Sequence, residues 1–193
     1  MISDHQNLLY EVRACTLCAA HLPLGPRPVL QFHPAARILI VGQAPGRKAH
    51  ETALPFDDQS GERLRGWLGV SRETFYDETK IALLPMGFCF PGTGKGGDLP
   101  PRPECAATWR KPLLNLLNKV ELTIVLGRYA VDWHLPDEAG KPLAEVVRGW
   151  QARWPRLLAL PHPSPRNIAW FKRHAWFETE IVPALQHRVG ELI

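Results

Sequence analysis

The stretch that decides the fold is Arg37-Ile-Leu-Ile-Val-Gly-Gln-Ala-Pro-Gly46, which continues to Leu54-Pro55-Phe56. The short, β-branched run from Ile38 to Val41 predicts a strand that is buried on both faces. Two glycines and a proline then end this strand in a tight turn. Ligands of open α/β sheets bind at the carboxyl ends of strands, so the turn marks a candidate site, with Gln43 at its mouth.

The composition is that of an ordinary globular protein, with 45% hydrophobic and 22% charged residues in 193. This length fits one domain with a substantial core, and no repeat or linker interrupts it, so we expect residues 1–193 to form a single domain. Lys and Arg exceed Asp and Glu by 23 − 19 = 4. Such a mild basic excess permits a polyanionic partner without requiring one.

The chain carries no pattern typical of secretion or membrane insertion. Residues 1–6 lack a basic region followed by an apolar run. No apolar stretch approaches the roughly 20 residues that a membrane span requires. We therefore expect a cytoplasmic protein without a membrane partner. We also expect it to be a monomer. Cytosolic thiols stay reduced, so the four cysteines are not expected to form disulfides.

Apolar runs alternate with helical patterns along the chain. Strands are expected at Arg37–Gly42, Lys80–Leu84, Leu122–Leu126 and Arg156–Leu160. Helices are expected at Gln6–Cys18, from Ser60, at Cys105–Val120 with a kink or restart at Pro112, at Arg128–Leu135, at Pro142–Trp150 and at the closing segment 177–192. This alternation predicts an α/β fold, a three-layer α/β/α arrangement around a central four-stranded, mostly parallel sheet.

Three loops are expected to meet at one edge of that sheet. They follow the first, second and fourth strands, and they span Gly42–Gly46, Pro85–Pro103 and Pro161–Asn167. The second loop is too rich in Gly and Pro for regular structure, and a loop of this length is usually functional. Polar or special residues follow the apolar runs, namely Gln43, Cys89, Lys95, His162, Ser164, Arg166 and Asn167. In a single loop of this kind, Gly and Pro could simply end the strand. Three such loops together predict a functional crevice.

The cysteines form a pattern of their own. Cys15 and Cys18 make a C-x2-C pair, whereas Cys89 and Cys105 lie far downstream. In a reducing compartment the alternatives are a metal site or incidental buried thiols. A C-x2-C pair at a helix end, completed by one loop cysteine and one at a helix start, can form a tetrahedral ligand set. Spacing alone leaves zinc and iron–sulfur open.

Three of these segments together resemble a known family. Gly42-Gln-Ala-Pro-Gly46, then Pro55-Phe56 nine residues after the turn, and finally His162-Pro-Ser164 are similar to the motifs of the uracil-DNA glycosylase superfamily. The cysteine layout resembles that of the thermophile-type uracil-DNA glycosylases, which carry a [4Fe–4S] cluster. The resemblance implies such a cluster, in a structural role, on Cys15, Cys18, Cys89 and Cys105, with zinc as the alternative.

The resemblance also implies a DNA-repair glycosylase that hydrolyses the N-glycosidic bond of uracil or another deaminated base in DNA. Such an enzyme extrudes a nucleotide, holds its base in a fitted pocket and stabilises the charge that develops on the leaving base. In the family pattern, Gly42 and Gln43 line the base pocket and Phe56 stacks on the uracil ring. His162 bonds the base carbonyl O2, and His162 and Gln43 are therefore the candidate catalytic residues.

The candidate DNA contacts lie in two of the loops. Ser164, Arg166 and Asn167 lie at the expected start of a helix, where free backbone amides and polar side chains can receive phosphates. Lys95 lies among glycines and could follow the DNA backbone.

Gln43 is the main departure from the family, because the thermophile-type enzymes carry a glutamate there. An amide can position water or bind the base, but it cannot take a proton. Arg47, Lys48 and Ala49 replace a short acidic run, and Pro85 replaces the family asparagine that recognises the uracil edge. Hydrolysis remains feasible, since stabilisation of the leaving group carries much of the barrier.

A substitute carboxylate or base could come from His50, Glu51, Asp57 or Asp58, and we favour Asp57 or Asp58 because they adjoin Phe56. Two other interpretations stay open. One is a non-catalytic or differently acting member of the superfamily that binds damaged or single-stranded DNA in the same crevice, as the changes at Gln43 and Pro85 would suit. The other is a cysteine–metal α/β protein that handles a small nucleotide.

Overall fold

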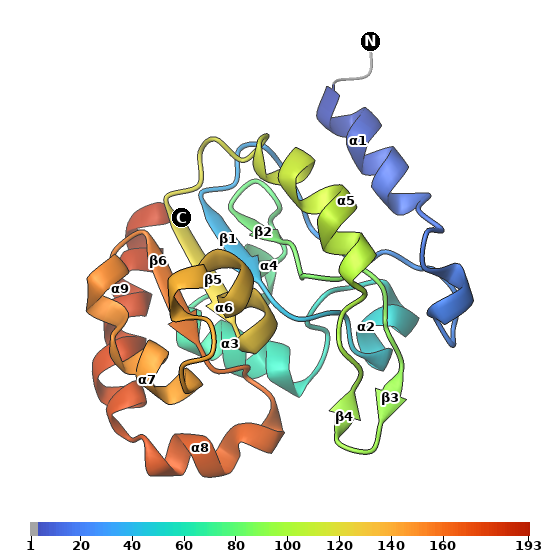
Figure 1. The fold of residues 1–193 in the computed structure, drawn as a ribbon. Helices are drawn as coiled ribbons and strands as arrows, with labels where there is room; N and C mark the ends of the chain where they lie inside the picture. Colours follow the sequence, from blue (N-terminus) through green and yellow to red (C-terminus); the bar gives the residue numbers. More distant parts are fainter. Residues whose placement is uncertain (1–3) are drawn as a thin grey trace.

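The computed structural model describes residues 4–193, and a four-stranded sheet forms its centre (Figure 1). Strands β1 (Ile38–Val41), β2 (Ile81–Leu83), β5 (Leu122–Leu126) and β6 (Leu157–Leu160) are arranged in the order β2-β1-β5-β6. All three pairings are parallel, and Ile38 lies opposite both Ile81 and Leu122. The expected three-layer fold is confirmed, and this sheet is wholly rather than mostly parallel.

Alternate residues of each strand point into two separate cores. Leu39 and Val41 of β1 pack into a core shared with helices α1, α5 and α6. Ile38 and Ile40 pack into a second core with α3, α9 and the π-helical turn that precedes α9. Because helices cover both faces, every residue of β1 is buried. This explains why the strand has a continuous apolar sequence rather than an alternating one.

The helices are short. Their bounds are α1 Asp4–Arg13, α2 Arg47–Thr52, α3 Gln59–Leu68, α4 Arg72–Phe75, α5 Pro103–Leu114, α6 Arg128–His134, α7 Leu143–Arg148, α8 Ile168–Arg173 and α9 Val182–Leu192. Four 3-10 turns lie at η1 Ala19–His21, η2 Pro136–Glu138, η3 Trp150–Arg153 and η4 Pro165–Asn167, and one π-helical turn, η5 Phe177–Ile181, precedes α9. Across residues 4–193, none of the helices has the length and apolar character needed to traverse a bilayer.

Two expected helices end earlier than their patterns indicated. The first ends at Arg13, because the chain turns through the C-x2-C segment rather than continuing the helix to Cys18. Helix α5 contains Pro112 without a restart and ends at Leu114. Beyond it, bonds such as Leu117 N–H to Leu114 O link residues three apart and tighten the chain into turns.

The long Gly- and Pro-rich segment contains regular structure, contrary to expectation. Strands β3 (Thr93–Gly94) and β4 (Gly97–Asp98) pair in an antiparallel hairpin that projects from the body of the molecule (Figure 1). Gly97 has a φ of +133°, which side chains with a Cβ rarely adopt. The same glycines that argued against regular structure therefore make this tight hairpin possible.

Candidate active site

A pocket of about 640 Å³ lies at the carboxyl edge of the sheet. The loops after β1, β2 and β6 contribute to it, as their placement after parallel strands predicted, and the start of α3 and the β3–β4 hairpin complete it. This volume is within the range of small-molecule sites. The lining includes Gly42, Gln43, Gly46, Lys48, Phe56, Asp58, Pro85, Asp98, His162, Ser164, Arg166 and Asn167.

Phe56 forms one wall of the pocket in a strained backbone conformation. Its φ is +55°, in the left-handed region that non-glycine residues seldom occupy. A Cβ on Gly61 would lie 1.8 Å from Phe56 O, so a glycine is needed there for the loop to reach this position. A Cβ on Gly42 would meet the Phe56 ring at 3.5 Å. The Gly42 backbone thus lies directly against the aromatic ring.

His162 faces Phe56 from the loop after β6. The two rings are stacked at 26° with centroids 6.4 Å apart. Burial lowers the pKa of His162, while the charges of Asp58 and Asp98 act in the opposite direction. The imidazole is therefore neutral at neutral pH and can donate one N–H.

Two side chains hold the His162 loop from behind. Asn167 Nδ2 donates to His162 O at 2.7 Å, and Arg63 of α3 donates to Pro163 O at 2.9 Å. Asn167 was expected to contact DNA, but its amide makes this internal bond. Arg63 was not predicted as a site residue, because no sequence pattern around a helical arginine indicates a partner 100 residues away.

Gln43 lies in the pocket lining, and its side chain is bound to the hairpin segment. Its Nε2 donates to Leu99 O at 3.0 Å, and its own carbonyl accepts from Gly87 N–H at 3.0 Å. Gln43 therefore joins the turn after β1 to the loop after β2.

The other predicted DNA contacts surround the mouth. Arg166 lines the pocket and donates one of its N–H groups to Gly96 O at 3.2 Å. Ser164 lines it too, and its hydroxyl accepts from Arg166 N–H as the cap of η4. Lys95 is exposed at the tip of the hairpin and is not part of the lining. Lys48 lines the pocket from α2. The sequence analysis named it only as one of the residues that stand in place of the family's acidic run.

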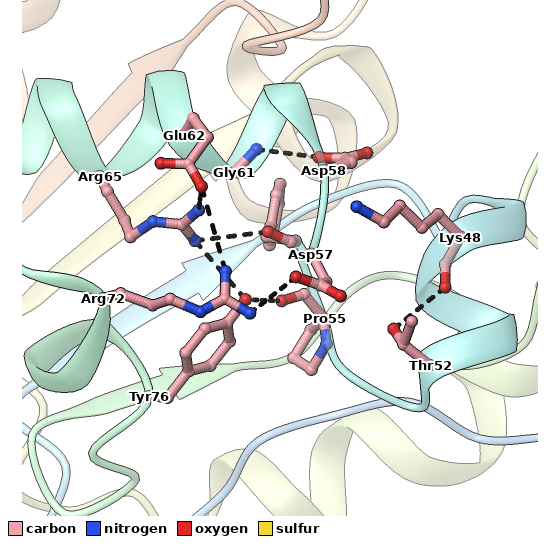
Figure 2. Close-up of polar contacts among 11 residues, drawn as sticks. Lys48, Thr52, Pro55, Asp57, Asp58, Gly61, Glu62, Arg65, Arg72 and Tyr76 are labelled. Atoms are coloured by element: carbon pink, nitrogen blue, oxygen red, sulfur yellow. Dashed lines mark hydrogen bonds and ion pairs between the residues drawn. The ribbon is translucent and has the colours of Figure 1, made fainter.

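The acidic residues near Phe56 differ in what they can do (Figure 2). Asp57 is directed at Arg72, with an Oδ1–Nη2 distance of 2.7 Å, and it lies outside the pocket lining. Asp58 lines the pocket and caps α3, accepting a bond from Gly61 N–H at 2.9 Å. His50 and Glu51, the other expected substitutes, lie on α2 outside the lining. Asp98, which the sequence analysis did not single out, enters from the hairpin.

A model of the uracil DNA glycosylase superfamily matches residues 30–186. This span covers most of the chain and contains the whole sheet and every residue of the pocket lining except Val29. The chain belongs to the uracil DNA glycosylase superfamily.

The superfamily match does not reach the first two cysteines, since it begins at residue 30. In the structure, Cys15, Cys18, Cys89 and Cys105 nevertheless line one small second pocket. Trp109 Nε1 donates to Cys15 Sγ at 3.2 Å, and Phe88 N–H donates to Cys105 Sγ at 3.3 Å. Burial raises the pKa of Cys89 to about 11 and that of Cys105 to about 12.

The four thiols are the candidate ligands of a metal group. Among residues 4–193, no three His, Cys, Asp or Glu side chains are grouped closely enough to hold one metal ion. A single zinc needs its sulfurs about 2.3 Å from the metal, and hence close to one another. A cluster that carries its thiolates on the outside allows them to stand further apart, and the two N–H donors could bond such thiolates.

Proposed function

We propose that this superfamily member is a DNA N-glycosylase that hydrolyses the bond between deoxyribose and uracil or another deaminated base. The observation that carries the proposal is the pairing of Phe56 and a neutral His162 across one pocket at the carboxyl edge of the sheet. An aromatic face can stack on a flipped base, and an imidazole N–H can bond its carbonyl.

Electrostatic stabilisation of the leaving base is the chemistry that these residues support. As the C1′–N1 bond breaks, its electron pair stays on the base, and negative charge develops on the base oxygen. A neutral imidazole donates a hydrogen bond to that oxygen without carrying a charge of its own into the buried site. Burial, which keeps the pKa of His162 low, thus favours the protonation state that the reaction needs.

DNA is the substrate that the surroundings of the pocket favour. Lys48 and Arg166 line the pocket, Lys95 is exposed at the hairpin tip, and the whole chain carries a net charge of +4. These cations can neutralise phosphates on either side of an extruded nucleotide. Pro85 has no polar side chain, so the base edge would be recognised there by shape and backbone rather than by an amide.

Base release from oligonucleotides that contain uracil, hypoxanthine or xanthine tests the proposal, with abasic sites detected by alkaline cleavage. Wild type should release at least one of these bases, and His162→Ala should lower the single-turnover rate by about 100-fold or more, as loss of a transition-state donor does. His187→Ala is the matched control, since that imidazole is 81% exposed on α9. Equal rates for the two variants would contradict the role of His162.

A second candidate function is the binding of damaged or single-stranded DNA without catalysis. Gln43 favours it, because its amide cannot accept a proton and is already bonded to Leu99 O. Wild-type protein that binds these oligonucleotides but leaves no alkali-labile site in any of them would support this alternative over the enzyme.

We further propose that Cys15, Cys18, Cys89 and Cys105 hold a [4Fe–4S] cluster, with zinc as the alternative. Their shared pocket, and the N–H groups of Trp109 and Phe88 that donate to two of the sulfurs, support this proposal. When bound, the cluster would join the N-terminal segment to the loop after β2 and to α5. Iron, sulfide and zinc analysis of protein purified without air separates the two, and Cys105→Ser should lose the visible absorbance of a cluster.

A further inference from the structure

Two carboxylates belong to residues that line the pocket. Of the described residues that line it, Asp58 and Asp98 are the acidic ones. Asp58 Oδ1 is engaged as the cap of α3 through its bond from Gly61 N–H. The charges of both carboxylates act on the His162 imidazole, so both lie near the residue that faces Phe56.

Asp98 is held through one carboxylate oxygen, and its other oxygen lies beside Gly46. Its Oδ1 accepts from the Thr93 hydroxyl across the hairpin at 3.3 Å. Its Oδ2 lies 3.5 Å from the point where a Cβ on Gly46 would stand. Gly46 has a φ of −75°, which any residue can adopt, so its backbone does not require a glycine. What the glycine provides is open space beside Asp98 Oδ2.

The two bonds that fix the hairpin flank this aspartate. Arg166 donates to Gly96 O, two residues before Asp98, and Gln43 donates to Leu99 O, one residue after it. Gly97 allows Arg166 to pack there, since a Cβ at that position would lie 1.8 Å from Arg166 Nη1. Side chains from the first and last loops of the site therefore hold the strand that carries the carboxylate.

We propose that Asp98 orients and deprotonates the attacking water, and that Gln43 contributes by holding the strand that presents it. The inference deepens the proposed glycosylase function and rests on it. The acid that Gln43 lacks is thus supplied from another segment of the chain, 55 positions later. Neither Asp57, which is paired with Arg72 outside the lining, nor the capping Asp58 is as available for this task.

The proposed step balances as a hydrolysis. The C1′–N1 bond breaks, and its electron pair leaves on the base, whose oxygen receives a hydrogen bond from His162. The water oxygen forms a bond to C1′ while one water proton passes to the Asp98 carboxylate. That proton is returned through solvent to the departed base anion. The negative charge of Asp98 also favours the sugar cation that precedes attack.

Asp98→Asn is the decisive variant, because asparagine keeps an oxygen for the Thr93 hydroxyl and removes the charge. Single-turnover release of whichever base the wild type excises should fall by about 100-fold or more. Affinity for the same oligonucleotide should stay equal or increase. Asp132→Asn, on α6 and paired with Arg128, is the matched control and should retain the wild-type rate.

Two further variants separate chemistry from structure. In Asp98→Ala, added formate should restore part of the lost rate by replacing the carboxylate, an effect that a purely structural role would not produce. Gly46→Ala should lower the rate at unchanged stability, because its methyl group fills the space beside Oδ2.

The outcomes distinguish the inference from the function on which it rests. Wild-type rates in Asp98→Asn, with activity lost in His162→Ala, would overturn the role of Asp98 and leave the glycosylase standing. A loss confined to Asp57→Asn or Asp58→Asn would overturn it in favour of those carboxylates. Wild-type protein that releases none of the three bases would overturn both proposals.

Discussion

The Arg110 guanidinium lies 2.7 Å from His134, measured from Nη2 to the imidazole Nε2. Arg110 is only 1% exposed, and its Nη1 donates to Leu84 O and Pro85 O, where the second strand enters the pocket wall. Its hydrogen bonds go to two main-chain carbonyls and a neutral imidazole. Because Nε2 accepts from the guanidinium, the imidazole proton must lie on Nδ1.

This pair predicts a loss of stability in acid. Burial, and then the charge of Arg110, lowers the pKa of His134 to about 4, whereas an unfolded chain has a histidine pKa of about 6.5. Between these two pH values His134 is protonated in the unfolded state and neutral in the folded state. The free energy of unfolding should therefore fall by up to about 3 kcal/mol as the pH drops through this window.

Urea unfolding at several pH values between 7 and 4 measures this loss. His134→Gln keeps an oxygen that can accept from Arg110 and does not titrate, so its stability should depend less on pH. His162 and His50, whose pKa values are also lowered by burial, still titrate in the variant, and the difference between the two proteins isolates His134. Parallel curves for wild type and variant would contradict the prediction.

Gly61→Ala should distort the Phe56 wall of the pocket. The added methyl would meet the Phe56 carbonyl, which is backbone and cannot rotate away. We expect a destabilisation of about 1–3 kcal/mol, together with weaker base release. Gly66→Ala in the same helix is the control, because nothing lies within 4 Å of its Cβ; replacing a helical glycine there should be neutral or stabilise by up to about 1 kcal/mol. Equal effects of the two substitutions would exclude the close contact as the cause.

Arg63→Met should act as the loss of a positioning residue. It removes the bond to Pro163 O and the packing of the guanidinium over Phe171, at 5.3 Å from the ring centroid. Without this support His162 is less well oriented, so kcat should fall about tenfold, equivalent to about 1.4 kcal/mol. KM and the salt dependence of DNA binding should change little. A reduced salt slope would instead identify Arg63 as a phosphate contact.

Arg166→Gln should weaken DNA binding in a salt-dependent manner. If the guanidinium contacts one phosphate, the slope of log K against log salt should decrease by about one. Binding titrations of a uracil-containing oligonucleotide at several salt concentrations measure that slope. Arg148→Gln is the control, since that guanidinium is paired with Glu180 at 3.0 Å. Identical slopes for the two variants would remove Arg166 from the DNA interface.

The sheet was predictable because its strands are buried on both faces. Leu122–Leu126 has the bounds that its apolar run indicated, and the neighbouring strands differ from expectation by one or two residues. The meeting of three loops followed from the same argument, since parallel strands end at one edge. Local pattern and global topology agree in this part of the chain.

The rest depends on contacts that no local pattern encodes. Asp98 lies in a segment whose glycines indicated irregular structure, and its position beside Gly46 arises only when the hairpin and the loop after β1 come together in the folded chain. Asp57 was favoured for its place beside Phe56 in the sequence, yet its side chain turns to Arg72. Phe56 has a positive φ, and the side chain that follows it in sequence points away from the pocket. Closeness to Phe56 in the sequence therefore did not predict closeness to the pocket.

Two side chains of the site, Arg166 and Gln43, fasten the hairpin segment through main-chain oxygens, those of Gly96 and Leu99. Residue 95, exposed between the two strands, takes no part in either attachment. The identity of that side chain is therefore free to change without loosening the scaffold. Substitutions at Lys95, in related proteins or in a directed library, could thus change which nucleic-acid structures are bound. The residues that carry the reaction would stay the same.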